Sequence, residues 1–232
     1  MFYAGIDLHK RDLVIALENE SGPVGRPRRF ACRDAESIAA HMAAHRPFVA
    51  VIEASASYRW LYELLAPLGE VVLAHPLRLR AILSARAKTD KLDAACLARL
   101  LRLGEIPRAC IPPRDYHELR ELSRARARLS RGVTEAMVRL HALAAARNVH
   151  SPYRKAFGPR GRRWIASVEL GVSGDLQRDE LLRRIVHFEA ERRSLDAALE
   201  KMSARFPETA ALTDIHGIGA YSALLIVAEI GE

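Results

Sequence analysis

An unbroken apolar run at residues 48–55, FVAVIEAS, constrains the fold of this chain more than any other stretch. The run contains β-branched residues and has an acid near its end, a pattern that is typical of a strand buried on both faces of a sheet. Strands of this kind belong to parallel or mixed sheets that are covered by helices. The chain is therefore expected to contain an α/β domain.

Strand and helix patterns alternate around this run. The predicted order is three strands, helix, strand, helix, strand, helix and helix, at residues 2–7, 12–18, 28–32, 34–45, 48–55, 58–66, 70–74, 77–87 and 90–103. The first two strands can pair as a hairpin, and the later strands can join in parallel through crossover helices. This order predicts a mixed sheet.

Four acids fall where chemistry collects in such sheets, at the carboxyl ends of the strands. Asp7 ends the first strand and Glu53 ends the central one. In KTDKLDA (88–94), a helix capped by Thr89 would carry Asp90 and Asp93 on one face. Four carboxylates in one crevice repel one another unless divalent cations lie between them, and Mg²⁺ or Mn²⁺ prefers hard oxygen ligands. Each acid alone is better explained as a turn former, a helix cap or a complement to a helix dipole.

Positive charge is concentrated in one segment. The net charge is +8, yet residues 120–163 alone hold 12 basic and 2 acidic side chains. Contact with a polyanion, and first of all with nucleic acid, explains this segment better than general solubility does. Almost no glutamates are interleaved to pair with the arginines. The predicted nucleic-acid contacts are Arg120, Arg124, Arg128, Arg131, Arg154, Lys155, Arg160, Arg162 and Arg163.

Two long amphipathic helices are predicted in the second half, from Tyr116 to about His150 and from about Gln177 to Phe206. They would pair antiparallel within the chain or between subunits. The basic and aromatic segment 151–163 between them suits RNA, and it also suits an ordinary loop between helices. Four arginines of the first long helix, Arg120, Arg124, Arg128 and Arg131, form an arginine stripe along one side of it. A solvated helix face likewise remains an alternative explanation for this arginine stripe.

The tail, residues 212–232, has the pattern helix, tight turn, helix, which resembles a helix-hairpin-helix element. Gly217 and Gly219 in its turn would let backbone N–H groups approach a phosphate. The three cysteines are isolated and lack zinc-site spacing, which fits a reducing cytoplasm. The first residues, MFYAGIDLHK, lack a long apolar run, so neither a signal peptide nor a membrane span is expected.

Three motifs together resemble the signatures of one family: GIDLHK (5–10), VIEASASYRWLYELL (51–65) and KTDKLDA (88–94). They are similar to those of insertion-sequence transposases with an Asp-Glu-Asp-Asp (DEDD) site, the IS110/IS1111 group, strongly over residues 1–105 and more loosely beyond. The amino-terminal domain of that family is RNase H-like (RuvC-like), in the manner of Holliday-junction resolvases. The resemblance implies that the catalytic, metal-binding acids are Asp7, Glu53, Asp90 and Asp93. The family more often shows a Thr-Gly pair just after the glutamate, where this chain has Ser55.

The resemblance also implies a plan for the whole chain. An RNase H-like catalytic domain would span 1–105, a basic linker and coiled-coil helices 106–206, and the start of a carboxy-terminal transposase domain 207–232. It implies Mg²⁺-dependent DNA cleavage and strand exchange, guided by a structured bridge RNA, by a homo-oligomer (dimer or tetramer) in the bacterial cytoplasm. The nucleophilic serine of the family is expected beyond this chain, so Ser222 is not assigned that role. The alternatives are a metal-dependent Holliday-junction-type nuclease and an inactive remnant that only binds nucleic acid.

Overall fold

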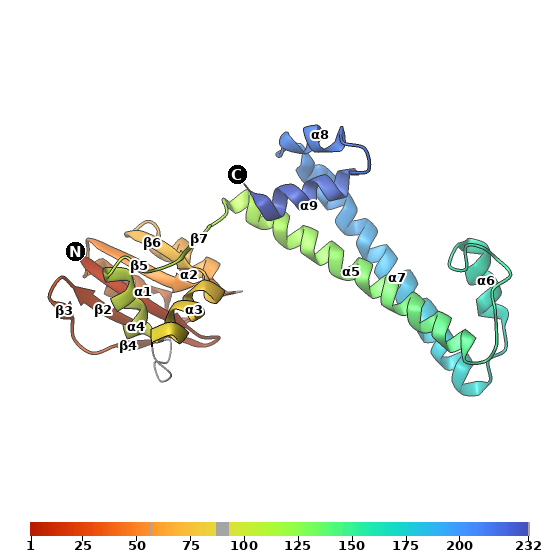
Figure 1. Ribbon diagram of the computed structural model, residues 1–232, viewed down its shortest axis with the longest axis horizontal. Coiled ribbons are helices and arrows are strands. Elements are labelled where there is room, and N and C mark those ends of the chain that lie inside the picture. The colour runs from red at the N-terminus through yellow and green to blue at the C-terminus, as the bar shows by residue number, and fades with distance from the viewer. Residues whose placement is uncertain (56, 87–92, 232) are drawn as a thin grey trace. The chain divides into compact units, whose positions relative to one another are not determined.

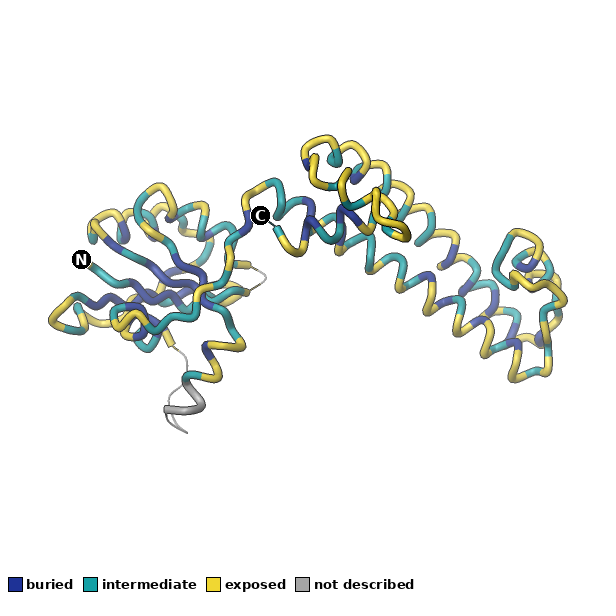
Figure 2. Tube along the Cα trace, turned by 45° about the horizontal axis from the view of Figure 1, so that its top comes forward, coloured by how far each residue is buried: buried dark blue, intermediate teal, exposed yellow. Residues whose placement is uncertain are grey.

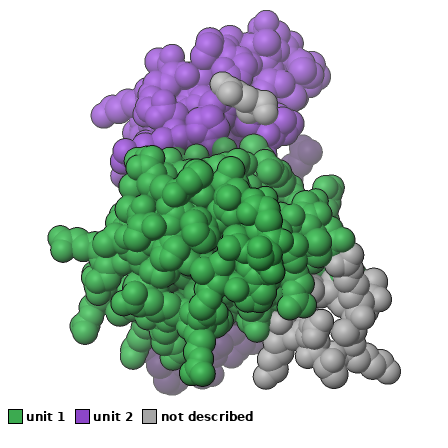
Figure 3. All heavy atoms as spheres, turned by 90° about the vertical axis from the view of Figure 1, so that its left-hand side faces the viewer, with its two compact units in different colours: residues 1–111 green, residues 112–232 purple. Residues whose placement is uncertain are grey.

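Strands and helices alternate along the first 111 residues, whereas the elements described after Pro112 are all helices. The computed structural model describes residues 1–55, 57–86 and 93–231, with the side chains of residues 83–86 excepted. The chain divides into two units, residues 1–111 and residues 112–232 (Figure 3).

The first unit is built on a mixed sheet of seven strands, in the order β3-β2-β1-β5-β6-β7 with β4 paired to β2 (Figure 1). β1 pairs antiparallel with β2 and parallel with β5, and β6 joins β5 in parallel. The bounds are β1 Phe2–Leu8, β2 Asp12–Asn19, β3 Gly22–Pro23, β4 Arg28–Ala31, β5 Phe48–Glu53, β6 Glu70–Ala74 and β7 Arg108–Ala109. The predicted hairpin followed by parallel additions is therefore confirmed, as is the RNase H-like α/β class.

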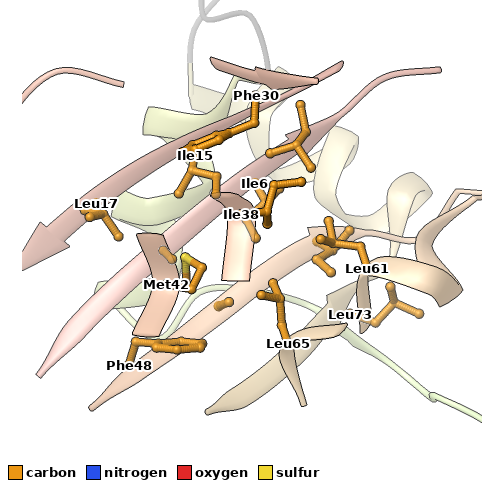
Figure 4. Packing of buried hydrophobic residues seen from close by; sticks show 14 residues of the cluster. Ile6, Ile15, Leu17, Phe30, Ile38, Met42, Phe48, Leu61, Leu65 and Leu73 are labelled. Carbon is orange, nitrogen blue, oxygen red and sulfur yellow. The ribbon is translucent and has the colours of Figure 1, made fainter. Parts of the chain in front are cut away.

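Helices cover both faces of this sheet. α1 (Ala35–Ala43) and α2 (Tyr58–Leu65) pack on one face, where the core is formed by side chains such as Ile6, Ile38 and Leu61 (Figure 4). The other face packs against α3 (Pro76–Arg86) and α4 (Ala94–Arg102), with a separate cluster that includes Val51, Val72 and Leu97. Figure 2 shows that the buried residues follow the strands between these layers.

α4 lies directly against β1 at Gly5. A Cβ atom on Gly5 would lie 2.0 Å from the Ala94 carbonyl oxygen and 2.3 Å from the Ala98 nitrogen, distances that no side chain permits. At the other end of α4, the Arg102 Nε donates to the carboxylate of buried Glu18 at 2.6 Å. Glu18 is opposite Tyr3 in the sheet. α4 therefore runs antiparallel to β1, and its first turn lies toward the carboxyl end of β1.

The start of α4 corrects one prediction. Asp93 has extended backbone angles, φ −129° and ψ 175°, and its carboxylate accepts a hydrogen bond from the Cys96 N–H at 2.8 Å. Asp93 is thus the N-cap, so the prediction that Asp93 lies inside the helix is wrong. Asp90 and its neighbours at 87–92 lie outside the described residues.

Two long helices, α5 (Arg114–Ala145) and α7 (Val172–Ser203), form an antiparallel hairpin in the second unit (Figure 1). Leu140 and Leu181 belong to one buried cluster near the tip, and Leu119 and Leu199 belong to another near the base. The pairing within one chain that the sequence allowed is therefore found. The remaining helices are α6 (Pro159–Ser167), α8 (Glu208–Thr213) and α9 (Ala220–Ile230).

Three short elements were not predicted. The two-residue strands β3 and β7 lie in segments whose glycine and proline content indicates turns and linkers. α6 begins within the basic segment 151–163 that was interpreted as a loop, and it continues to Ser167. The two strands contain too few residues to show an alternation.

Gly5→Ala should destabilise the first unit by about 3 kcal/mol or more, because its methyl group would overlap the α4 backbone. Thermal unfolding of the full chain in a Trp164→Phe background, so that the fluorescence comes from Trp60 in the first unit, measures the loss. Ala44→Ser, which adds one atom at the exposed end of α1, is the control and should leave the transition unchanged. Equal transitions for both variants would mean that α4 does not depend on close contact at Gly5.

Candidate metal site and nucleic-acid interface

Asp7 and Glu53 lie side by side at the carboxyl ends of neighbouring parallel strands. The register pairs Ile6 of β1 with Ile52 of β5, so the next residues, Asp7 and Glu53, are opposite each other. Neighbouring strands are separated by about 4.8 Å. Both isoleucines belong to the core beneath α1 and α2. Because side chains alternate along a strand, both half-buried acids point to the other face, which α4 covers.

Asp93 lies at the same edge of the sheet. It immediately precedes Ala94, whose carbonyl oxygen packs against Gly5, and Gly5 shares a sheet face with Asp7 two residues later. Asp93 is exposed, and the Oδ1 atom of its side chain caps α4. The fold thus brings Asp7, Glu53 and Asp93 to one face and one edge.

His9 is a neighbour of this site that sequence reasoning missed. Its Nε2 lies 3.1 Å from the Asp7 Oδ2, and the His9 and Asp7 side chains are 57% and 29% exposed. The signal was present in GIDLHK, because residues two apart in an extended chain point the same way. His9 can orient the Asp7 carboxylate, and when protonated it offsets part of the negative charge.

These acids fit a hard divalent cation. Carboxylate oxygens are the donors that Mg²⁺ and Mn²⁺ prefer, and two carboxylates side by side gain from a cation between them. Across the described ranges, which omit Asp90, no three His, Cys, Asp or Glu side chains are grouped closely enough to hold a metal ion. The four-acid site therefore stays a prediction, supported by the common edge and face of the three acids that are described.

Two members of the arginine stripe on α5 form hydrogen bonds with other parts of the chain. Arg124 forms two hydrogen bonds of 2.7 Å with the two carboxylate oxygens of Glu229. Arg120 donates to the Ala228 carbonyl oxygen at 2.7 Å, at the carboxyl end of α9. The hydrogen bond from Arg124 lowers the pKa of Glu229 below its usual value. The premise that these arginines lack an acidic partner is wrong for Arg120 and Arg124.

Arg162 also forms hydrogen bonds within the chain. Its guanidinium donates to both oxygens of Glu189 on α7, at 2.6 and 2.5 Å, and its Nε donates to the Phe157 carbonyl oxygen at 2.6 Å. The partner Glu189 follows Arg162 by 27 residues and comes from another helix. Sequence reasoning paired residues only with close neighbours on their own helix, so it missed this pair as well.

The other predicted basic contacts remain available on the surface. Six of them are exposed and form no ion pair among the described residues: Arg128, Arg131, Arg154, Lys155, Arg160 and Arg163. Gly217 has φ +93°, which favours glycine, and Gly219 is the N-cap of α9. The contact of these basic residues and of Gly217 and Gly219 with nucleic acid stays a prediction.

A cluster of three side chains holds α9 to the hairpin. The Arg126 guanidinium lies 3.8 Å from the centre of the Tyr221 ring, and its Nε donates to Asp196 on α7 at 2.8 Å. The Tyr221 hydroxyl donates to the Ser123 carbonyl oxygen on α5 at 3.0 Å. Together with the contacts to Glu229, this cluster fixes the glycine turn before α9 relative to α5 and α7.

Comparison with known proteins gives concordant results. A family model described as a transposase, of the DEDD and IS110 type, matches residues 4–146. The protein y4qE of Sinorhizobium fredii (strain NBRC 101917 / NGR234), named as a candidate transposase, is 29% identical over 170 residues, which cover 70% of this chain and 43% of that protein. The chain thus spans less than half the length of this curated relative. None of the helices described has the length and apolar character needed to cross a membrane.

Glu189→Gln should cost the second unit about 2 kcal/mol at pH 7, because the charged partner of Arg162 is lost. The Arg162 hydrogen bond holds the pKa of Glu189 below its ordinary 4.5. The stabilisation is therefore complete above the unfolded-state pKa and is lost as the pH falls through the lower folded-state pKa.

Urea unfolding at pH 7 and at about pH 3, in a Trp60→Phe background so that the fluorescence comes from Trp164, measures this dependence. The loss should be smaller at the lower pH, because the folded-state carboxylate begins to be protonated there. Glu191→Gln, at an exposed position on the same helix, is the matched control and should show little loss at either pH. A Glu189→Gln loss that is equal at both pH values would contradict the role of the ion pair.

Proposed function

Because the chain belongs to the DEDD family of insertion-sequence transposases, we propose that it takes part in metal-dependent cleavage and exchange of DNA strands. The observation that carries the proposal is the pairing of Asp7 with Glu53 at adjacent strand ends, beneath the first turn of α4. Family membership rests on residues 4–146, which include all four predicted acids. The activity itself belongs to the proposal, since the chain spans 43% of the relative.

In this proposal the four acids Asp7, Glu53, Asp90 and Asp93 hold Mg²⁺ or Mn²⁺. A bound cation would stabilise the negative charge that develops on the scissile phosphate and orient that phosphate for in-line attack. The rigid strands hold Asp7 and Glu53 in position, and the cap hydrogen bond holds Asp93. His9 orients the Asp7 carboxylate through their 3.1 Å contact.

The nucleic-acid partners are proposed on the basis of charge. The exposed arginines of α5 and of the segment around α6 would contact the phosphates of DNA and of a structured guide RNA. Assembly as a homo-oligomer and a place in the bacterial cytoplasm are parts of the same proposal, which the family resemblance suggests.

Glu53→Gln and Asp7→Asn should each reduce Mg²⁺-dependent DNA cleavage by about a hundredfold or more, because a ligand of the cation is lost. DNA affinity should be unchanged, since neither acid contacts phosphate directly in this account. The matched control is Glu36→Gln, an exposed acid on α1 across the sheet. Cleavage is measured on a labelled insertion-sequence end with Mg²⁺.

The products of that reaction separate the alternatives. A covalent protein–DNA adduct supports the transposase mechanism, whereas release of free ends supports a junction nuclease that uses activated water. Binding without cleavage by the wild-type chain supports a remnant that only binds nucleic acid. Wild-type cleavage by both acid variants would remove Asp7 and Glu53 from the site.

Arg128→Ala combined with Arg131→Ala should reduce the slope of log affinity against log salt by about 2 for duplex DNA, because each lost phosphate contact contributes about 0.9. The matched control is the double variant Arg120→Ala and Arg124→Ala on the same helix. Since Arg120 and Arg124 already contact α9, their loss should weaken the packing of α9 and leave the slope nearly unchanged. Equal slopes for the two double variants would contradict the proposal that Arg128 and Arg131 contact phosphate whereas Arg120 and Arg124 do not.

A further inference from the structure

We propose that the hollow at the tip of the α5–α7 hairpin binds one unstacked nucleobase of a single strand together with its phosphate. The hollow has a volume of about 340 Å³ and is lined by residues from the end of α5, the following loop and α6. That volume lies near the lower end of the range of about 300–1,000 Å³ for small-molecule sites. It suits one base with its sugar, whereas a duplex or a helix would be too large.

Five side chains with aromatic rings line this hollow. Tyr153, Phe157 and Trp164 line it, and the imidazoles of His141 and His150 lie at the same surface. Every base has a flat π-face that stacks on such rings, so the site would accept bases with little regard to sequence. The imidazoles are hydrogen-bonding groups that can meet the edge of a base.

The positive charge around the hollow favours the binding of a polyanion. The chain has no acidic residue from Ala136 to Val168, a stretch that contains seven arginines and lysines. Arg154 lines the hollow itself, and Lys155, Arg160 and Arg163 are exposed nearby. A base in the hollow would therefore have cations beside its phosphate. An uncharged aromatic ligand or an apolar peptide would leave these charges unused.

The walls are fixed before any ligand arrives. The Arg147 Nε donates to the Leu170 carbonyl oxygen at 2.7 Å, which ties the end of α5 to the start of α7. Arg162 ties α6 to α7 through Glu189 and to the loop through the Phe157 carbonyl oxygen. A Cβ atom on Gly161 would lie 2.0 Å from the Ala156 carbonyl oxygen, so the loop lies directly on α6. A preformed site needs little ordering on binding, which favours affinity.

This site is separate from the acids of the first unit. Binding of a base needs neither a divalent cation nor strand cleavage, so the inference can hold or fail independently of the proposed transposase activity. The strand could come from a loop of RNA or from single-stranded DNA, since both supply the same base and phosphate chemistry. The 2′-hydroxyl group distinguishes the two.

The test uses the full chain with Trp60→Phe, so that Trp164 is the remaining tryptophan and its fluorescence reports on the hollow. The probes are a single-stranded hexanucleotide of RNA, the same sequence in DNA, and the corresponding DNA duplex. Single strands should quench Trp164, and the duplex should not. Tyr153→Ala should weaken single-strand binding about tenfold, because a stacking surface is lost, and should leave duplex binding unchanged.

Arg154→Ala and Arg160→Ala form a matched pair, because both remove one exposed arginine of the same segment but only Arg154 lines the hollow. Arg154→Ala should weaken single-strand binding more than duplex binding, whereas Arg160→Ala should affect both alike. Tyr153 is 41% exposed, so its loss should preserve the fold, which circular dichroism verifies.

Tighter binding of RNA than of DNA would identify RNA as the source of the strand, and tighter binding of DNA would identify single-stranded DNA. Equal binding would support a site that contacts only the base and phosphate, which both strands supply. The proposal is overturned if neither strand quenches Trp164. It is also overturned if Tyr153→Ala weakens duplex and single-strand binding to the same degree.

Discussion

The close contact between α4 and β1 at Gly5 is the constraint on which the proposed site depends. The backbone of Ala94 and Ala98 occupies the space that any side chain at Gly5 would need. Close packing of this kind fixes both the height of the helix above the sheet and its position along β1. Because α4 begins one residue after Asp93, the contact also fixes where that carboxylate lies relative to Asp7 and Glu53. The buried Glu18 and its partner Arg102 hold the far end of the helix.

The basic residues of the second unit divide into two groups with different tasks. Arg120, Arg124 and Arg162 contact acids or carbonyl oxygens from other helices, and they hold α9 and α6 to the hairpin. The second group is exposed and remains available to a polyanion. A count of charges cannot separate these groups, because the acidic partners of the first group are 27 and 105 residues away in the chain. The positive surface is therefore smaller than the composition suggests. The helices that carry it are held together by the contacts of the first group.

Much of the first unit follows from its sequence, and the exceptions have physical causes. The apolar run at 48–55 predicted a central buried strand, and the order of elements predicted the parallel pairing that brings Asp7 next to Glu53. The start of α4 was misplaced because threonine and aspartate are both good caps, so the sequence alone did not single out Asp93, whose carboxylate caps the helix. α6 and the pairing of Arg124 with Glu229 depend on tertiary contacts, which no local pattern records.

Asp7 and Glu53 are proposed to take part in holding a divalent cation. Electron paramagnetic resonance of free Mn²⁺ during titration with the protein measures this binding without any DNA or catalytic step. We expect saturable loss of the free Mn²⁺ signal with the wild-type chain and with Glu36→Gln, and little loss with Asp7→Asn. Binding of Mn²⁺ by Asp7→Asn with wild-type affinity would show that Asp7 is not a ligand of the cation.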